Sequence, residues 1–288
     1  MRFWPALILV LLVACTTQAP PEPAAVVAVQ TVQDQHNRVP LLEGKATLFV
    51  DSATSAPAVV WQAGQQLPNP VPAQLAQGRV EAVTRSGQTH AFTFQAAAPL
   101  RVQLLPVAIG SQPSPTVSVA DLALLERAVV QLLPFNAVHF TTLPEQALPA
   151  NVTGDLWPSV LHLTQQHTTR QGITIAVIPA VRDQESSGFA LTGQGAAALM
   201  LRHHDSSSLA LSTFVHEVAH ALGAKHAPCG SAANPDPRFP TSDGRVPETD
   251  VMFDQQTKQR ITGVRFDLMG YCSPKWVSSF TTLKTLGR

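Results

Sequence analysis

The residues best suited to chemistry lie between His216 and His226, where the sequence reads H-E-V-A-H-A-L-G-A-K-H. On a helix, residues four positions apart share one face, so the imidazoles of His216 and His220 can bind the same ion. Gly223 can adopt a positive φ, which would end the helix and turn His226 back toward the other two histidines. Three imidazoles leave one tetrahedral position open to water, and this arrangement is typical of a catalytic zinc site.

Glu217 follows the first histidine and is rotated away from the metal-binding face. Its carboxylate is therefore expected to reach a metal-bound water and to act as the general base without binding the metal. The alternative is an amphipathic helix whose histidines bind nothing. The metal site is favoured because the polar groups gather on one face, while the other face carries apolar residues for packing: Val215, Val218, Ala219 and Leu222.

The pattern H-E-x-x-H-x-x-G-x-x-H resembles that of the metzincins, zinc endopeptidases in which this helix is followed by a turn that contains methionine. The matching turn spans residues 266–272 and reads F-D-L-M-G-Y-C. The resemblance implies that Met269 forms an apolar floor beneath the histidines. It also implies that Tyr271, the only tyrosine of the chain, binds the metal or stabilises the oxyanion. The match is specific over residues 209–276, and part of it is also similar to secreted bacterial zinc proteases that degrade mucins.

Two cysteines, Cys229 and Cys272, lie close to these motifs. Each follows its motif by three residues, counted from the third histidine and from the methionine. Because the resemblance places both motifs at one site, and because an exported chain folds in an oxidising compartment, a disulfide between them is expected. The alternative is a pair of buried free thiols.

Residues 1–15 have the features of an export signal. Arg2 provides the positive charge, and the apolar run from Phe3 to Val13 is too short to span a bilayer. The run ends in L-V-A-C, which resembles the bacterial lipoprotein box, so Cys15 is expected to carry the lipid anchor. No Asp follows this cysteine, and in this respect the chain resembles bacterial lipoproteins that are sorted to the outer membrane or cell surface. An ordinary cleaved signal peptide is the alternative.

The charge balance excludes some classes of partner. Lys plus Arg and Asp plus Glu both number 19, and the isoelectric point is near 7.2. A neutral chain argues against nucleic acid or an anionic membrane surface as the main partner. The protein is therefore expected to contact the membrane only through its lipid anchor. No feature of the sequence indicates an oligomeric state.

The mature chain divides into three parts. Residues 16–38 are rich in Pro, Ala, Gln and Val without periodicity and are expected to form a flexible tether, with an edge strand at 26–32 as the alternative. Short alternating segments separated by Pro and Gly predict a small antiparallel β-sandwich over residues 39–99. Residues 100–288 are expected to form the zinc protease domain, an α+β unit with a twisted mixed sheet, an active-site helix and a C-terminal helix.

Periodicity predicts the elements of this domain. Strands are expected at 100–107, 137–140 and 173–179, helices at 119–133 and 155–166, and a last helix from Trp276 toward Leu286. By analogy with metzincins, residues 189–200 are placed as an antiparallel edge strand that binds extended substrate. The run 203–205, His-His-Asp, is read as a polar loop rather than a second metal site, and Ser207 or Ser208 as the helix N-cap.

Together these residues predict a zinc-dependent endopeptidase that hydrolyses extracellular or envelope proteins. Zinc would be held by the three histidines, with Glu217 as the general base and Tyr271 assisting at the oxyanion. Two other classes stay open. One is a surface protein that keeps the zinc fold but only binds glycoproteins, and the other is a zinc hydrolase that acts on an amide outside proteins. Cleavage products, rather than metal content, would separate these classes.

Overall fold

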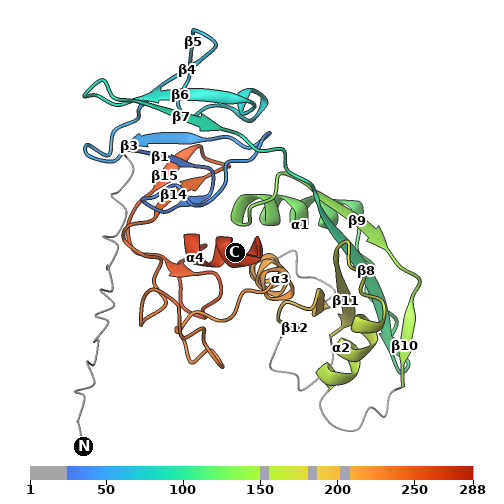
Figure 1. The fold of residues 1–288 in the computed structure, drawn as a ribbon. Coiled ribbons are helices and arrows are strands. Elements are labelled where there is room, and N and C mark those ends of the chain that lie inside the picture. Colours follow the sequence, from blue (N-terminus) through green and yellow to red (C-terminus); the bar gives the residue numbers. More distant parts are fainter. Residues whose placement is uncertain (1–24, 150–155, 181–186, 202–207, 288) are drawn as a thin grey trace, which may run out of the picture.

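The structure, a computed structural model, describes residues 25–149, 156–180, 187–201 and 208–287. It is an α+β protein, which confirms the fold class in its general form. An all-β part lies above a part that contains the helices and a mixed sheet (Figure 1). The expected lipid-bearing Cys15, the polar run 203–205 and the N-cap candidate Ser207 lie outside the described residues.

The N-terminal part consists of two antiparallel sheets. One pairs β1 (Val26–Val29) with β3 (Leu48–Asp51). The other has the order β5-β4-β6-β7, from β4 (Val59–Gln62), β5 (Gln65–Leu67), β6 (Arg79–Val83) and β7 (Thr89–Thr93), with a short 3₁₀ turn at Ala73–Leu75. Alternate residues face inward, and the Phe49 and Phe92 rings meet edge to face with centroids 5.2 Å apart. A separate buried cluster holds the two sheets together.

The second part is built on a six-stranded mixed sheet. Its strands are β8 (Leu100–Ile109), β9 (Val138–Thr142), β10 (Gln146–Leu148), β11 (Ile173–Pro179), β12 (Gly188–Leu191) and β13 (Ala196–Leu201). The main order is β10-β8-β11-β13-β12, with β9 also paired to β8. All pairings are parallel except that of β12 with β13. The expected edge strand over 189–200 is therefore a hairpin, in which β12 forms the edge and β13 lies inside the sheet.

Helices cover both faces of this sheet. α1 (Val119–Leu132) and α3 (Ser208–Ala221) pack on one face, and α2 (Leu156–Gln166) packs on the other. Strand β11 is buried along its whole length because Ile175 and Val177 face α1 and α3, while Ile178 faces α2. The strands at 100 and 173 and the helices at 119 and 155 follow their predictions closely, and Ser118 caps α1 by accepting a hydrogen bond from the Asp121 amide.

The C-terminal segments close the structure around α3. They comprise β14 (Val251–Asp254), β15 (Gln259–Ile261), β16 (Phe266–Asp267), β17 (Lys275–Trp276) and α4 (Ser279–Thr285). The last helix is shorter than predicted. Lys275 and Trp276 form a strand beside β16, and α4 begins only after Ser278, whose hydroxyl accepts a hydrogen bond from the Thr281 amide.

The expected flexible tether is wrong over its second half. Residues 26–29 form the buried strand β1, and β2 (Val32–Gln33) pairs with β14 in the C-terminal part. The indole N–H of Trp276 also donates to the Thr31 carbonyl at 3.1 Å. The apolar run V-V-A-V pairs with β3, whereas the partner of β2 comes from the C-terminal part, which a local pattern cannot reveal. This segment therefore belongs to the folded body.

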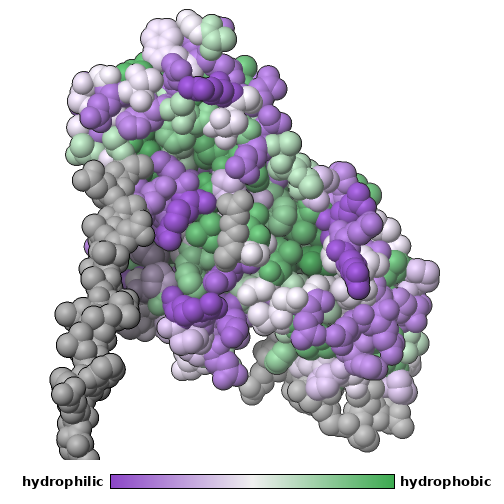
Figure 2. Space-filling model, in the orientation of Figure 1, coloured by the Kyte–Doolittle hydropathy of each residue, from purple (hydrophilic) through white to green (hydrophobic). Residues whose placement is uncertain are grey.

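The face of the molecule drawn in Figure 2 carries both hydrophilic and hydrophobic residues. Figure 2 shows hydrophilic residues over most of the N-terminal part and the β8–β10 edge, with hydrophobic residues reaching the surface between them. Within the described residues, no helix has the length and hydropathy needed to cross a bilayer.

Candidate metal centre and cleft

Helix α3 places the first two histidines on one face, as their spacing predicts. The rings of His216 and His220 meet edge to face with centroids 4.6 Å apart. The helix ends at Ala221, and Gly223 has a φ of 113°, a conformation that favours glycine. The chain then turns back, so that ligand atoms of His216, His220 and His226 all lie within 4.8 Å of one another. This three-histidine group could hold a metal ion.

Backbone carbonyls fix the orientation of all three rings. The Nδ1 atom of His216 lies 2.9 Å from the Leu268 carbonyl, and that of His220 lies 2.7 Å from the carbonyl of Ala224. The Nδ1 atom of His226 lies 2.6 Å from the Ala233 carbonyl. Because a carbonyl oxygen only accepts hydrogen bonds, each Nδ1 carries the proton, and each Nε2 keeps its lone pair for a metal.

The facing nitrogens fit a bound cation. The Nε2 atoms of His220 and His226 are 3.0 Å apart, and in these tautomers neither has a proton to donate to the other. Burial, with a smaller contribution from the other imidazoles, lowers the pKa of His216 to about 3 and that of His220 to about 4. The neutral imidazole is the form that binds metal, so the site maintains the ligands in the required state. An all-imidazole donor set suits zinc and other transition metals such as copper, iron and nickel.

Glu217 lies beside these ligands and is almost completely buried. Its Oε2 atom has no hydrogen-bond partner among the described residues, and burial raises the pKa of the carboxyl to about 8. A buried polar atom without a partner is rare in folded proteins. The carboxyl group is therefore available for a water or substrate group in the cleft, and a cation on the histidines would favour its ionised form. Gly188 on β12 packs directly against it.

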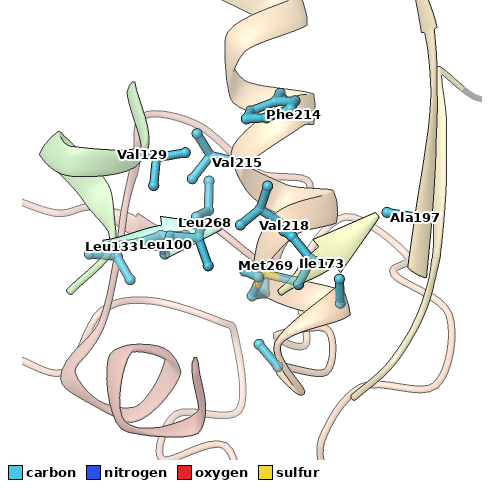
Figure 3. Packing of buried hydrophobic residues seen from close by; sticks show 14 of the residues in the cluster. Leu100, Val129, Leu133, Ile173, Ala197, Phe214, Val215, Val218, Leu268 and Met269 are labelled. Atoms are coloured by element: carbon cyan, nitrogen blue, oxygen red, sulfur yellow. The ribbon is translucent and has the colours of Figure 1, made fainter. Parts of the chain in front are cut away.

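Met269 and Tyr271 lie on the turn that faces α3. Met269 is fully buried and packs beside Val218 and Ile173 (Figure 3), within the same hydrophobic cluster as the inner face of α3. Tyr271 is 53% exposed, and its hydroxyl is 3.2 Å from Nε2 of His226. The structure thus brings both residues to the histidine group.

A disulfide connects the two segments that carry these groups. Cys229 and Cys272 are bonded, with Cα atoms 5.7 Å apart, which is the pairing expected from the sequence. The Tyr271 amide also donates to the Cys229 carbonyl at 3.1 Å. The third histidine and the tyrosine are therefore held together by both covalent and backbone bonds.

The histidines form one wall of an open cleft of about 960 Å³. Strand β12 forms another wall, so the edge of the sheet lies beside the metal centre. Two lining residues, Lys225 and Lys275, were not predicted as site residues. Lys225 stands inside the motif at a position that the pattern leaves free, whereas no local signal in the sequence could have placed Lys275 in the cleft.

The loop between His226 and β14 shows no second metal group among the described residues. Its aspartates, which could have offered oxygen ligands for calcium, already have partners. Asp236 pairs with Arg238 at 3.2 Å, and Asp243 pairs with Arg245 at 2.9 Å. Asp250 accepts two hydrogen bonds from Ser279. These carboxylates stabilise the loop itself.

Comparison with known proteins adds no further information on this centre. No protein-family model matches the chain, and a search of curated proteins found no match. The function is therefore inferred from the chemistry of the cleft.

Proposed function

We propose that the protein is a zinc-dependent endopeptidase of the metzincin type. The observation that carries the proposal is the convergence of three imidazoles beside the buried carboxyl group of Glu217, whose Oε2 atom has no hydrogen-bond partner among the described residues. His216, His220 and His226 would hold the ion through Nε2. A purely structural zinc site usually has four protein ligands, whereas three ligands in an open cleft leave room for water and substrate.

When bound, zinc supplies a Lewis acid that polarises the scissile carbonyl and lowers the pKa of a bound water. Glu217 accepts the proton of the attacking water and returns it to the leaving amine nitrogen. Tyr271 donates its hydroxyl proton in a hydrogen bond to the developing oxyanion. Met269, which is fully buried, would form the apolar floor behind the ligands.

The position of β12 supports a peptide as the substrate. This strand is the edge of the sheet and pairs only with β13 among the described residues. Ser187 to Ala190 line the cleft beside Glu217, so a free row of backbone donors and acceptors runs along it. An extended peptide that adds to this edge by strand pairing would bring its backbone carbonyls past the metal centre.

The test is a cleavage profile. The purified, zinc-loaded protein and its Glu217→Ala variant are incubated with a diverse peptide library, and new termini are read by mass spectrometry. New termini with the wild-type protein alone are expected, because the variant keeps the ligands but loses the base. Zinc content, measured in parallel, should be one ion per chain in both proteins.

The same data separate the competing classes. If the folded, zinc-loaded wild type yields no new termini from peptides or glycoproteins, the endopeptidase proposal is wrong and the binding-protein alternative takes its place. Equal cleavage by the Glu217→Ala variant would remove Glu217 from its role as base. His220→Ala serves as the metal control and should lose zinc.

The export signal leads to a second part of the proposal, that Cys15 carries a lipid and anchors the enzyme at the cell envelope. The support is the L-V-A-C sequence after a short apolar run. Expression in a bacterium should yield a membrane-associated chain whose mass includes the lipid. Cys15→Ser should release the protein from the membrane fraction, and an unchanged distribution would contradict the anchor.

A further inference from the structure

The cleft is lined by more positively charged groups than negatively charged ones. Two ammonium groups, Lys225 and Lys275, line it, and Glu217 is the only carboxylate among its described lining residues. A divalent cation on the histidines would add to the positive side. Clefts lined by one sign of charge concentrate ligands of the opposite sign. The cleft is therefore positively charged around the metal centre.

Lys275 is the more constrained of the two lysines. It lies on β17, which pairs with β16, and the next residue, Trp276, is buried and bonded to Thr31. Its side chain is half-buried and lines the cleft together with the three histidines. Lys225 is exposed, and its charge acts on the buried carboxylate of Asp236, which pairs with Arg238.

The ammonium of Lys275 has no carboxylate within ion-pair distance in the part of the chain that the structure describes. Asp267 is the acid whose charge reaches it. The oxygens of Asp267 already accept hydrogen bonds from the amides of Met269 and Ser278 and from the Thr281 hydroxyl. A half-buried ammonium without a close partner is stabilised when a ligand supplies the anion.

We propose that Lys275 selects peptide substrates that carry a carboxylate close to the scissile bond. This inference rests on the proposed peptidase function and assigns its substrate class. The carboxylate can belong to an Asp or Glu side chain within the peptide or to its C-terminus, since the ammonium recognises both. Lys275 is thus a specificity-determining residue, and Lys225 adds a weaker, exposed charge at the rim.

The first experiment measures cleavage. The sequences cut in the library are resynthesised in matched pairs, with Glu or Gln beside the scissile bond and with a free or amidated C-terminus. The wild type should cleave the carboxylate member about tenfold more efficiently, in line with the strength of a charge-assisted hydrogen bond. Whichever pair differs identifies the source of the carboxylate, and equal rates in both pairs would overturn the inference.

Variants assign the effect to one side chain. Lys275→Gln should abolish the preference mainly through KM, and Lys275→Arg should retain it, which separates charge from fold. Lys258→Gln makes the same change in net charge on the exposed β14–β15 turn and should retain the preference. If Lys275→Gln retains the preference, or if Lys225→Gln alone abolishes it, the assignment to Lys275 is wrong.

A binding measurement keeps this test independent of turnover. Short fluorescent peptides, again in Glu/Gln and free/amidated pairs, are titrated into the zinc-loaded Glu217→Ala protein, and anisotropy is recorded. The carboxylate peptide should bind about tenfold more tightly, and adding Lys275→Gln should remove the difference. If the wild type cleaves nothing while this difference persists, the peptidase function fails but carboxylate recognition stands. Equal binding of all peptides would overturn the recognition itself.

Discussion

Gly188 and Glu217 are packed so closely that no side chain fits between them. A Cβ built on Gly188 would lie 2.8 Å from Cγ of Glu217 and 2.9 Å from its Oε1. The edge strand and the proposed general base therefore define each other's position, which links the place where a peptide would lie to the group that would activate water.

Gly188→Ala should consequently displace the Glu217 carboxylate while leaving the histidines in place. Misplacing a reacting group by about 1 Å can lower kcat about a hundredfold. We expect a loss of that order, with zinc content and the unfolding midpoint close to wild type. Steady-state kinetics and metal analysis check this. Full activity in the variant would show that the carboxylate can move without penalty.

Tyr271→Phe should affect turnover more than metal binding. The hydroxyl is 3.2 Å from His226 Nε2, but the three rings are each held by a backbone carbonyl that the substitution does not alter. Loss of one oxyanion donor typically lowers kcat by about a hundredfold or more. Competition with a chromophoric chelator measures zinc affinity. A large fall in zinc affinity would instead make Tyr271 a ligand.

Removal of the disulfide should lower both stability and metal affinity. Cys229 and Cys272 are separated by 43 residues, and closing a loop of that length stabilises a protein by about 4 kcal/mol in the chain-entropy account. The double variant with serine at both positions should lose about 3–4 kcal/mol in urea unfolding. It should also bind zinc more weakly, because His226 and Tyr271 are no longer held together. Unchanged zinc affinity would show that backbone bonds alone fix the loop.

Asp250 should make stability depend on pH. Burial raises its pKa to about 6, so the folded carboxyl keeps its proton to a higher pH than the unfolded one. The contribution of this difference in pKa to the free energy of unfolding is present in full below pH 4 and is lost as pH rises through 6. The free energy of unfolding changes by about 3 kcal/mol as a result. Asp250→Asn should remove this dependence while its amide oxygen still accepts from the Ser279 amide.

The measurement is urea unfolding of zinc-free wild type and Asp250→Asn from pH 4 to 8. The lowered pKa values of His216 and His220 act in the opposite direction, because their unfolded forms bind protons below about pH 6.5. Only the difference between the two proteins isolates Asp250. The free energy of unfolding of the variant should rise relative to that of the wild type as pH increases. A difference that does not change with pH would contradict the raised pKa of Asp250.

The sequence predicts the centre better than its surroundings, and the reason is the range of the interactions. The spacing of His216 and His220 and the conformational freedom of Gly223 act within a few residues, so a local pattern locates them. Strand β11 is apolar throughout because it is buried on both faces, which a short window also detects.

Long-range pairing explains what the sequence did not predict. Residues 26–33 looked like a tether because their strand partners lie outside any short window: β1 pairs with β3, and β2 pairs with β14 in the C-terminal part. Trp276 looked like the start of a helix, but its indole N–H donates to the Thr31 carbonyl and its backbone pairs with β16. The same strand places Lys275 in the cleft, so the error about the helix and the missed cleft residue have one cause.

The pairing of β2 with β14 also affects the order of folding. Val32 belongs to the same buried cluster as Met252, Trp276 and the inner face of α3, so this core cannot close until nearly the whole chain is available. Contacts this distant in sequence form slowly, because loop closure must precede them. A chain that is still being synthesised thus lacks its finished core, and the proposed peptidase activity would appear only after β14 has paired with β2.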